Sequence, residues 1–257
     1  MSKVKFLNMI MSIWILMFML TAQSVNAVEL IFNTQNFPPF SYQVGSVVAG
    51  PVADIIRGIC SEINVDCQFR RLAWSRAQTE VKQGKAHAMF VIGWSENRAK
   101  WLHFTPPILN TEYGFFVKTD NPLQYKDAKD VNNYVVGVYG PSNTYWTLED
   151  LKKKAPEMKI DVSTNSEIAF LKLSDAKTDA VFSNKSVGLC LIKKLNITNI
   201  RYAGCEKKLN YYIGFNQKFV SQELVDRFNE TFKQFHKRGI IHHVLSIYNM
   251  DTAQLEE

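Results

Sequence analysis

The longest apolar run that follows the N-terminal region spans residues 86–93, Ala-His-Ala-Met-Phe-Val-Ile-Gly. Apolar residues that continue without alternation predict a strand buried on both faces, as in a parallel sheet. A second pattern covers residues 52–63, where apolar side chains recur at helical spacing and form one stripe. Pro51 suits the first position of that helix. Buried strands together with amphipathic helices favour an α/β fold.

The order of the predicted elements indicates two similar units. The first has strands over residues 29–33, 67–72 and 86–93, with helices over residues 51–63 and 74–83 between them. The second has strands over residues 134–139, 160–162 and 179–182, with helices between them. Thr164, with Glu167 three residues later, fits a capping box at the start of a helix. Residues 87–90 and 179–182 each follow a helix and lead into a polar turn, which predicts two lobes, with chance likeness as the alternative.

The C-terminal part is predicted to return to the first unit. A strand over residues 211–215 is followed by helices over residues 221–238 and 240–248. If these helices pack on the first unit, the chain crosses between the lobes twice, and two crossings can form a hinge.

The N-terminus differs from the rest of the chain. Lys3 and Lys5 precede a mostly apolar run over residues 6–20, and Val25-Asn26-Ala27 presents small residues before a cleavage point. This layout predicts a secretory signal peptide over residues 1–27 and an exported, periplasmic protein. The alternative is an uncleaved anchor, but the run is shorter than the roughly 20 residues that span a bilayer.

The buried strand at residues 86–93 ends beside a candidate anion site. Ligands of open α/β sheets lie beyond the carboxyl ends of the strands. Ser95 can cap a helical turn there, and its free backbone N–H groups favour an anion. Arg98 adds a planar guanidinium that fits a carboxylate. A surface salt bridge is the alternative role for Arg98.

Charge and metal-binding residue types exclude several classes of function. The formal net charge is +6, of which Lys3 and Lys5 contribute two. Basic clusters such as residues 152–154 lack interleaved aromatic residues, so no nucleic-acid partner is expected. No histidine and cysteine spacing typical of zinc occurs, and neither a metal nor a cofactor is expected.

The cysteine count permits disulfides in an exported chain. We expect neighbours in sequence to pair, Cys60 with Cys67 and Cys190 with Cys205; spacing alone leaves four buried thiols as the alternative.

In its order of motifs, the chain resembles the periplasmic solute-binding proteins of the amino-acid-binding type that serve ABC transporters. The likeness covers residues 28 to about 250. The residues that carry it are 39–42, the helix over residues 52–63, Trp74 with Val81 and Gly84, Arg98, residues 104–106 and 136–138, and Asp179-Ala180. It implies a type II fold with two α/β lobes, each a mostly parallel sheet covered by helices, joined by two hinge strands. We expect residues 28–110 and 211–257 in lobe 1 and residues 111–210 in lobe 2. The seven-residue separation of Cys60 and Cys67 matches a disulfide of the histidine- and lysine-binding members.

The resemblance also implies ligand contacts. Arg98 matches the arginine that pairs with the ligand carboxylate, and Phe37 and Trp74 match positions that sandwich the ligand side chain. The remaining expected contacts are Phe40, Ile92, Gly93, Ser142, Asn143, Thr144 and Asn184. Asn184 stands where members that bind free amino acids carry an acid for the ligand ammonium. Its amide can accept one hydrogen bond but supplies no charge.

The first hypothesis for function is therefore a monomeric binding protein that captures a small carboxylate-bearing solute, such as a polar amino acid, for an ABC permease. A second is an enzyme similar to periplasmic cyclohexadienyl dehydratases, with Glu96 or Glu112 as its acid or base. A third is a sensor that presents its ligand state to a separate receptor.

Overall fold

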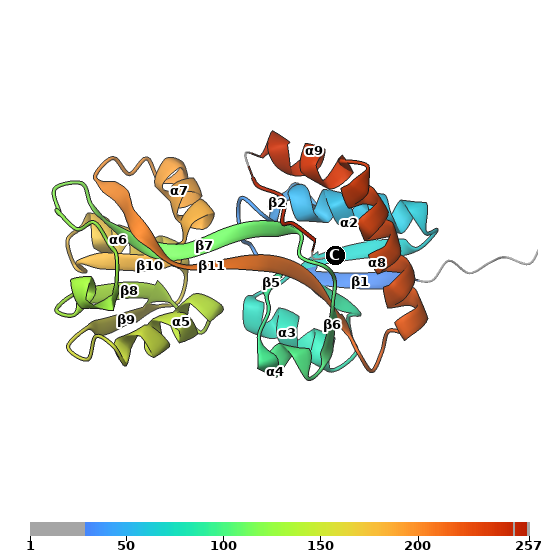
Figure 1. Ribbon diagram of the computed structural model, residues 1–257, viewed down its shortest axis with the longest axis horizontal. Coiled ribbons are helices and arrows are strands. Elements are labelled where there is room, and N and C mark those ends of the chain that lie inside the picture. Colours follow the sequence, from blue (N-terminus) through green and yellow to red (C-terminus); the bar gives the residue numbers. More distant parts are fainter. Residues whose placement is uncertain (1–28, 249, 256–257) are drawn as a thin grey trace, which may run out of the picture.

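The computed structural model describes residues 29–248 and 250–255, and it has two lobes side by side (Figure 1). The predicted signal peptide lies outside the described residues. One sheet runs through both lobes in the strand order β4-β1-β5-β11-β7-β10-β8-β9, with β6 also paired to β11. Within the described residues, no helix is both long and apolar enough to span a membrane. The predicted two-lobed α/β class is confirmed.

The first lobe contains the strand–helix alternation predicted from its apolar pattern. Its parallel strands are β1 (Glu29–Thr34), β4 (Asp66–Arg71) and β5 (Ala88–Gly93). A short hairpin, β2 (Tyr42–Val44) and β3 (Val47–Ala49), and the strand β6 (Leu102–Phe104) complete its strands. The covering helices are α2 (Pro51–Glu62), α3 (Trp74–Lys82) and α4 (Glu96–Ala99), joined from the C-terminal part by α8 (Gln222–Lys237) and α9 (Ile240–Ile247) (Figure 1).

The second lobe repeats the parallel arrangement. Its central strand β8 (Val135–Tyr139) pairs in parallel with β9 (Lys159–Ser163) and β10 (Ala180–Asn184). The helices are α5 (Asn143–Lys152), α6 (Ser166–Ser174) and α7 (Lys185–Lys194), preceded by a short 3-10 helix, η1 (Ala128–Val131).

Two long antiparallel strands connect the lobes. Figure 1 shows β7 (Leu109–Lys118) and β11 (Ile200–Asn216) running from one lobe into the other. The apolar pattern predicted only residues 211–215 of β11 as a strand. The rest escaped detection because its half-exposed residues 205–210 are mostly polar and charged. The expected lobe boundaries at residues 110/111 and 210/211 fall within these two strands.

The helix caps confirm one sequence prediction and correct another. Ser95 caps α4, and its side chain accepts a hydrogen bond from the backbone N–H of Arg98. The predicted capping box of Thr164 and Glu167 is wrong. Asn165 is the N-cap of α6, because its side chain accepts the N–H of Ile168. Asparagine is a favoured N-cap residue, so the helix starts one residue later than predicted.

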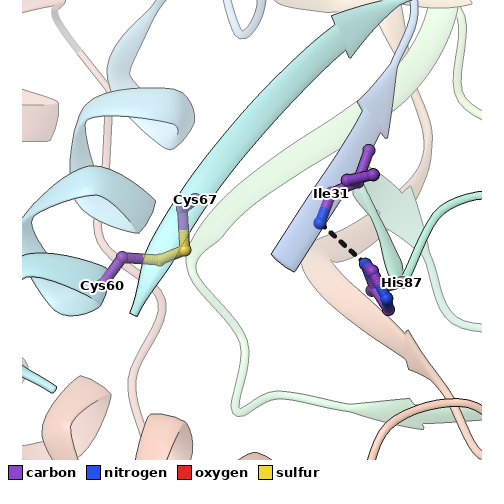
Figure 2. The surroundings of a disulfide bond; sticks show 4 residues. All are labelled: Ile31, Cys60, Cys67 and His87. Carbon is purple, nitrogen blue, oxygen red and sulfur yellow. Dashed lines mark hydrogen bonds between the residues drawn. A yellow bond between two sulfur atoms is a disulfide. The ribbon is translucent and has the colours of Figure 1, made fainter. Parts of the chain in front are cut away.

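One of the two predicted disulfides is present. Cys60 at the end of α2 and Cys67 on β4 are bonded, which ties the helix to the edge strand (Figure 2). The predicted pairing of Cys190 with Cys205 is wrong, because both are free thiols. Cys190 lies on α7 near Lys193 and Lys194, whereas Cys205 lies on β11 beside Glu112 of β7. Burial raises the pKa of both thiols.

His87, directly before β5, has a structural role. The backbone N–H of Ile31 donates to its Nδ1 at 2.9 Å (Figure 2). The ring must therefore be neutral, with its proton on Nε2. Burial lowers the pKa of His87, a shift that Glu29 partly opposes. Protonation would remove the acceptor from this contact between β1 and β5.

Acidification is therefore expected to destabilise the fold through His87. The stabilising contribution is complete above the unfolded pKa of about 6.5 and is lost as the pH falls through the lower folded pKa. Between about pH 8 and about pH 5, wild type should lose about 1 kcal/mol more unfolding free energy than His87→Asn, whose amide oxygen can replace Nδ1. Denaturant unfolding across this range measures the difference, with the exposed His243→Asn as control. Parallel pH curves for wild type and His87→Asn would contradict this role.

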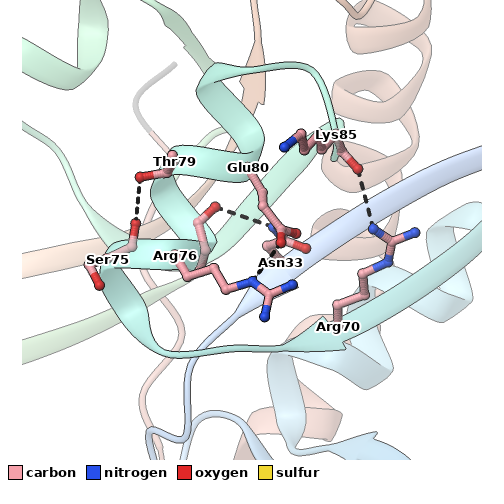
Figure 3. A network of polar contacts seen from close by, with 8 residues as sticks. Asn33, Arg70, Ser75, Arg76, Thr79, Glu80 and Lys85 are labelled. Carbon is pink, nitrogen blue, oxygen red and sulfur yellow. Dashed lines mark hydrogen bonds and ion pairs between the residues drawn. The ribbon is translucent and has the colours of Figure 1, made fainter.

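A polar network holds α3 against β1 and β4 (Figure 3). The side-chain amide of Asn33 on β1 donates to the carbonyl oxygen of Ala77 at 3.2 Å and to Glu80 at 3.5 Å. Arg76 pairs with Glu80 at 2.8 Å within the helix. The hydrogen bond from Arg76 lowers the pKa of Glu80. The network therefore fixes the position of α3, whose first residue is Trp74.

Candidate functional site

A pocket lined by residues of both lobes lies between them. Its lining includes all the predicted ligand contacts except Phe40. The lining residues are Gln35, Phe37, Trp74, Val91, Ile92, Gly93, Arg98, Tyr113, Tyr139, Ser142, Asn143, Thr144, Ser166, Ser183, Asn184 and Tyr211.

Arg98 is the charged group of this pocket. Its side chain reaches back from α4 to the end of β5, where Nη1 donates to the carbonyl oxygen of Gly93 at 2.8 Å. The guanidinium carbon lies 5.5 Å from the centre of the Trp74 ring, a cation–π geometry. The residue is 8% exposed, and no carboxylate among the described residues pairs with it. Burial lowers the pKa of Arg98, although a guanidinium stays charged in proteins.

Aromatic side chains form one wall of the pocket. The rings of Phe37 and Tyr211 are 5.8 Å apart, and Tyr211 extends into the pocket from β11. Phe40 packs behind both rings, 5.3 Å from Phe37 and 5.2 Å from Tyr211. Because Phe40 is 1% exposed and absent from the lining, its place is in the core that supports the wall.

The backbone of β5 is irregular where it faces the pocket. Val91 has a φ of 52°, in the left-handed region that β-branched residues rarely adopt. The pairing of β5 with β11 skips this residue, since Phe90 pairs with Ile213 and Ile92 pairs with Tyr212. Such bulges and strained residues are common beside binding sites. The bulge places residues 91–93 in the pocket lining.

The second lobe presents the N-terminus of α5. Ser142 caps this helix, because its Oγ accepts the N–H of Tyr145 at 3.1 Å and donates to the carbonyl oxygen of Tyr139 at 2.6 Å. Asn143 and Thr144 occupy the first helical positions, where backbone N–H groups have no partner within a helix. The expected contacts Ser142, Asn143 and Thr144 therefore line the same pocket as Arg98.

Asn184 lines the pocket, as expected, and it also has hydrogen-bond partners within the protein. Its Oδ1 accepts the N–H of Val187 and caps α7, so this oxygen is directed at the protein's own helix. Its Nδ2 donates to Thr111 of β7 at 2.6 Å and to Tyr211 of β11 at 3.1 Å. One lone pair of Oδ1 is therefore used within the protein, and acceptance from a ligand ammonium stays a prediction. The side chain also links β10 to both connecting strands.

Sequence reasoning missed several lining residues, of which the tyrosines matter most. Tyr139 ends β8, and Tyr113 and Tyr211 lie on the connecting strands. Burial raises the pKa of all three phenols, so they are neutral at physiological pH. The signal that could have found Tyr139, Gln35 and Ser183 is their place at or near the carboxyl ends of parallel strands.

The candidate acid–base groups of the enzyme hypothesis do not line this pocket. Glu96 is the first residue of α4 and lies outside the lining. Glu112 pairs with Lys185 at 2.8 Å and lines a separate hollow behind the connecting strands.

Residues 30–250 match the family model of the bacterial extracellular solute-binding proteins, family 3, and the chain belongs to that family. The chain is 25% identical over 224 residues to the arginine-binding periplasmic protein of Mannheimia haemolytica, covering 84% of this chain and 89% of the relative.

Solved structures show the same fold. An ancestral arginine-binding protein bound to arginine superimposes with a TM-score of 0.75 at 22% identity, covering 85% of this chain and 96% of the other. A histidine kinase sensor domain with similarity to periplasmic binding proteins superimposes with a TM-score of 0.78 at 20% identity, covering 89% of this chain and 98% of the other.

Proposed function

We propose that this protein captures a small carboxylate-bearing solute, such as a polar amino acid or a related compound, without catalysis. The observation that carries the proposal is the buried Arg98, which has no carboxylate partner among the described residues. A buried charge is costly unless it is paired, so a ligand carboxylate is the natural partner. The relatives' names support the same chemistry, since arginine carries a carboxylate.

Capture is proposed to occur by closure of the lobes about β7 and β11. Residues 28–110 with 211–257 would move against residues 111–210, and the ligand would be enclosed between Arg98 and the N-terminus of α5. Phe37 and Trp74 would pack on the ligand body. Gly93 and Asn143 already approach across the cleft, because a Cβ atom on Gly93 would lie 2.9 Å from Nδ2 of Asn143.

We propose that the mature protein is an exported monomer that delivers its ligand to the permease of an ABC transporter. Membership of the extracellular solute-binding family supports this role. Presentation of the ligand to a receptor is the second candidate, and the likeness to a histidine kinase sensor domain favours it.

Ligand binding should stabilise the protein against denaturation. A carboxylate at a hundredfold excess over its dissociation constant is expected to add about 2.7 kcal/mol to the unfolding free energy. A thermal-shift panel of free amino acids, short peptides and organic acids, with the primary amides of the same acids as controls, measures this. If no carboxylate in such a panel shifts the melting temperature, the proposal fails.

A further inference from the structure

The lining of the pocket carries positive charge without any negative charge. This limits which carboxylates the pocket can bind well. Among its lining residues, Arg98 is the one ionised group and no aspartate or glutamate is present. The nearby phenols add no negative charge, because burial raises the pKa of Tyr113, Tyr139 and Tyr211. The protein part of the pocket therefore carries one positive charge, which one ligand carboxylate neutralises.

Asn184 determines the direction of the hydrogen bonds that it makes with Thr111 and Tyr211. Because its Oδ1 accepts from Val187, its Nδ2 must face Tyr211 and Thr111 as a donor. Tyr211 thus accepts from Asn184, and its own O–H proton is left for another acceptor. Each hydroxyl has one proton to donate.

A second buried phenol, that of Tyr113, also lines the pocket. Its Oη lies beside the end of β5, 3.9 Å from the place of a Cβ atom on Gly93, whose carbonyl oxygen contacts Arg98. The hydroxyl of Tyr113 and the guanidinium of Arg98 thus both offer hydrogen-bond donors to the same part of the pocket.

We infer that this site takes a monocarboxylate that has no α-ammonium group, and binds it more tightly than the corresponding free α-amino acid. The inference rests on the proposed function and narrows its substrate class. The carboxylate of an amino acid would pair with Arg98, but its ammonium would be enclosed with no aspartate or glutamate among the lining residues. Loss of one charge-assisted hydrogen bond weakens binding by roughly 10- to 100-fold.

The test compares matched pairs that differ by the amino group alone. The probes are phenylalanine against 3-phenylpropionate and leucine against 4-methylpentanoate, titrated by calorimetry into the wild-type protein. We expect each deaminated acid to bind at least about tenfold more tightly than its amino acid. Equal or tighter binding of the amino acids would overturn the inference and leave the proposed function intact. If neither member of any pair nor any other carboxylate binds, the proposed function itself fails.

A second arm changes the direction of the hydrogen bonds. In Asn184→Asp, a carboxylate can still accept the N–H of Val187, while Thr111 and Tyr211 become donors to it. The preference for the deaminated acids should then shrink by at least about tenfold. Asn165→Asp is the matched control, because it adds the same charge at the N-cap of α6. An equal change in both variants would overturn the role of Asn184. If Asn184→Asp fails to fold, the titrations of the matched acids and amino acids into wild type test the inference.

Discussion

Replacement of Arg98 by alanine is expected to weaken carboxylate binding by at least about 100-fold. Removing one partner of a buried ion pair costs about 3–5 kcal/mol, because the other charge is left enclosed and unpaired. Arg98→Lys should recover part of the affinity, since an ammonium supplies the charge but not the planar pair of donors. Calorimetric titration with the carboxylate that gives the largest thermal shift measures both variants.

The stability of the unliganded protein separates this role from a structural one. Arg98→Ala removes a buried charge that pairs with no described carboxylate, and this offsets the loss of the hydrogen bond to Gly93, so the unfolding free energy should change by less than about 1 kcal/mol. A surface salt bridge would predict unchanged ligand affinity instead. Near-wild-type affinity of Arg98→Ala would refute the assignment of Arg98 as the carboxylate anchor.

Replacement of Gly114 by alanine is expected to cost about 3 kcal/mol of unfolding free energy. Gly114 lies on β7 where this strand meets the irregular part of β11, opposite Cys205. An added Cβ atom would collide with the carbonyl oxygen of Gly204 and with the hydroxyl group of Tyr202. The backbone of β11 would have to move, and the pairing of the two connecting strands would be lost locally. Denaturant unfolding measures the effect.

Gly137→Ala is the matched control for Gly114. It also lies inside a strand, but the nearest atom to its added Cβ atom is a methyl carbon of Val181 at 3.3 Å. Alanine lowers the conformational entropy of the unfolded chain, and this partly offsets the cost of the tighter packing. The unfolding free energy of Gly137→Ala should therefore change by no more than about 1 kcal/mol. Similar effects of the two substitutions would contradict the close packing of β7 against β11 at Gly114.

Local patterns were sufficient to predict the first half of the site. The apolar run of β5, the cap at Ser95 and the position of Arg98 are all encoded within residues 86–98. The contacts at residues 142–144 were instead implied by the family resemblance, and they follow the parallel strand β8, where ligand-facing turns are expected. These features depend on neighbours in sequence, which periodicity and capping rules describe well.

Contacts between distant segments could not be predicted in the same way. The amide of Asn184 is engaged by Thr111 and Tyr211, which lie 73 and 27 residues away in sequence. The bulge at Val91 depends on its pairing with β11. The free state of Cys190 and Cys205 depends on how α7 and β11 pack, which the spacing of cysteines does not reveal.

The most direct test of the central claim is the identity of the small molecule that the purified protein releases on denaturation, determined by mass spectrometry. We expect a compound that carries a carboxylate, that lacks an α-ammonium group, and that rebinds to wild type but not to Arg98→Ala. A released compound without a carboxylate, or one that rebinds equally well to both proteins, would contradict the assignment of this pocket as a carboxylate site.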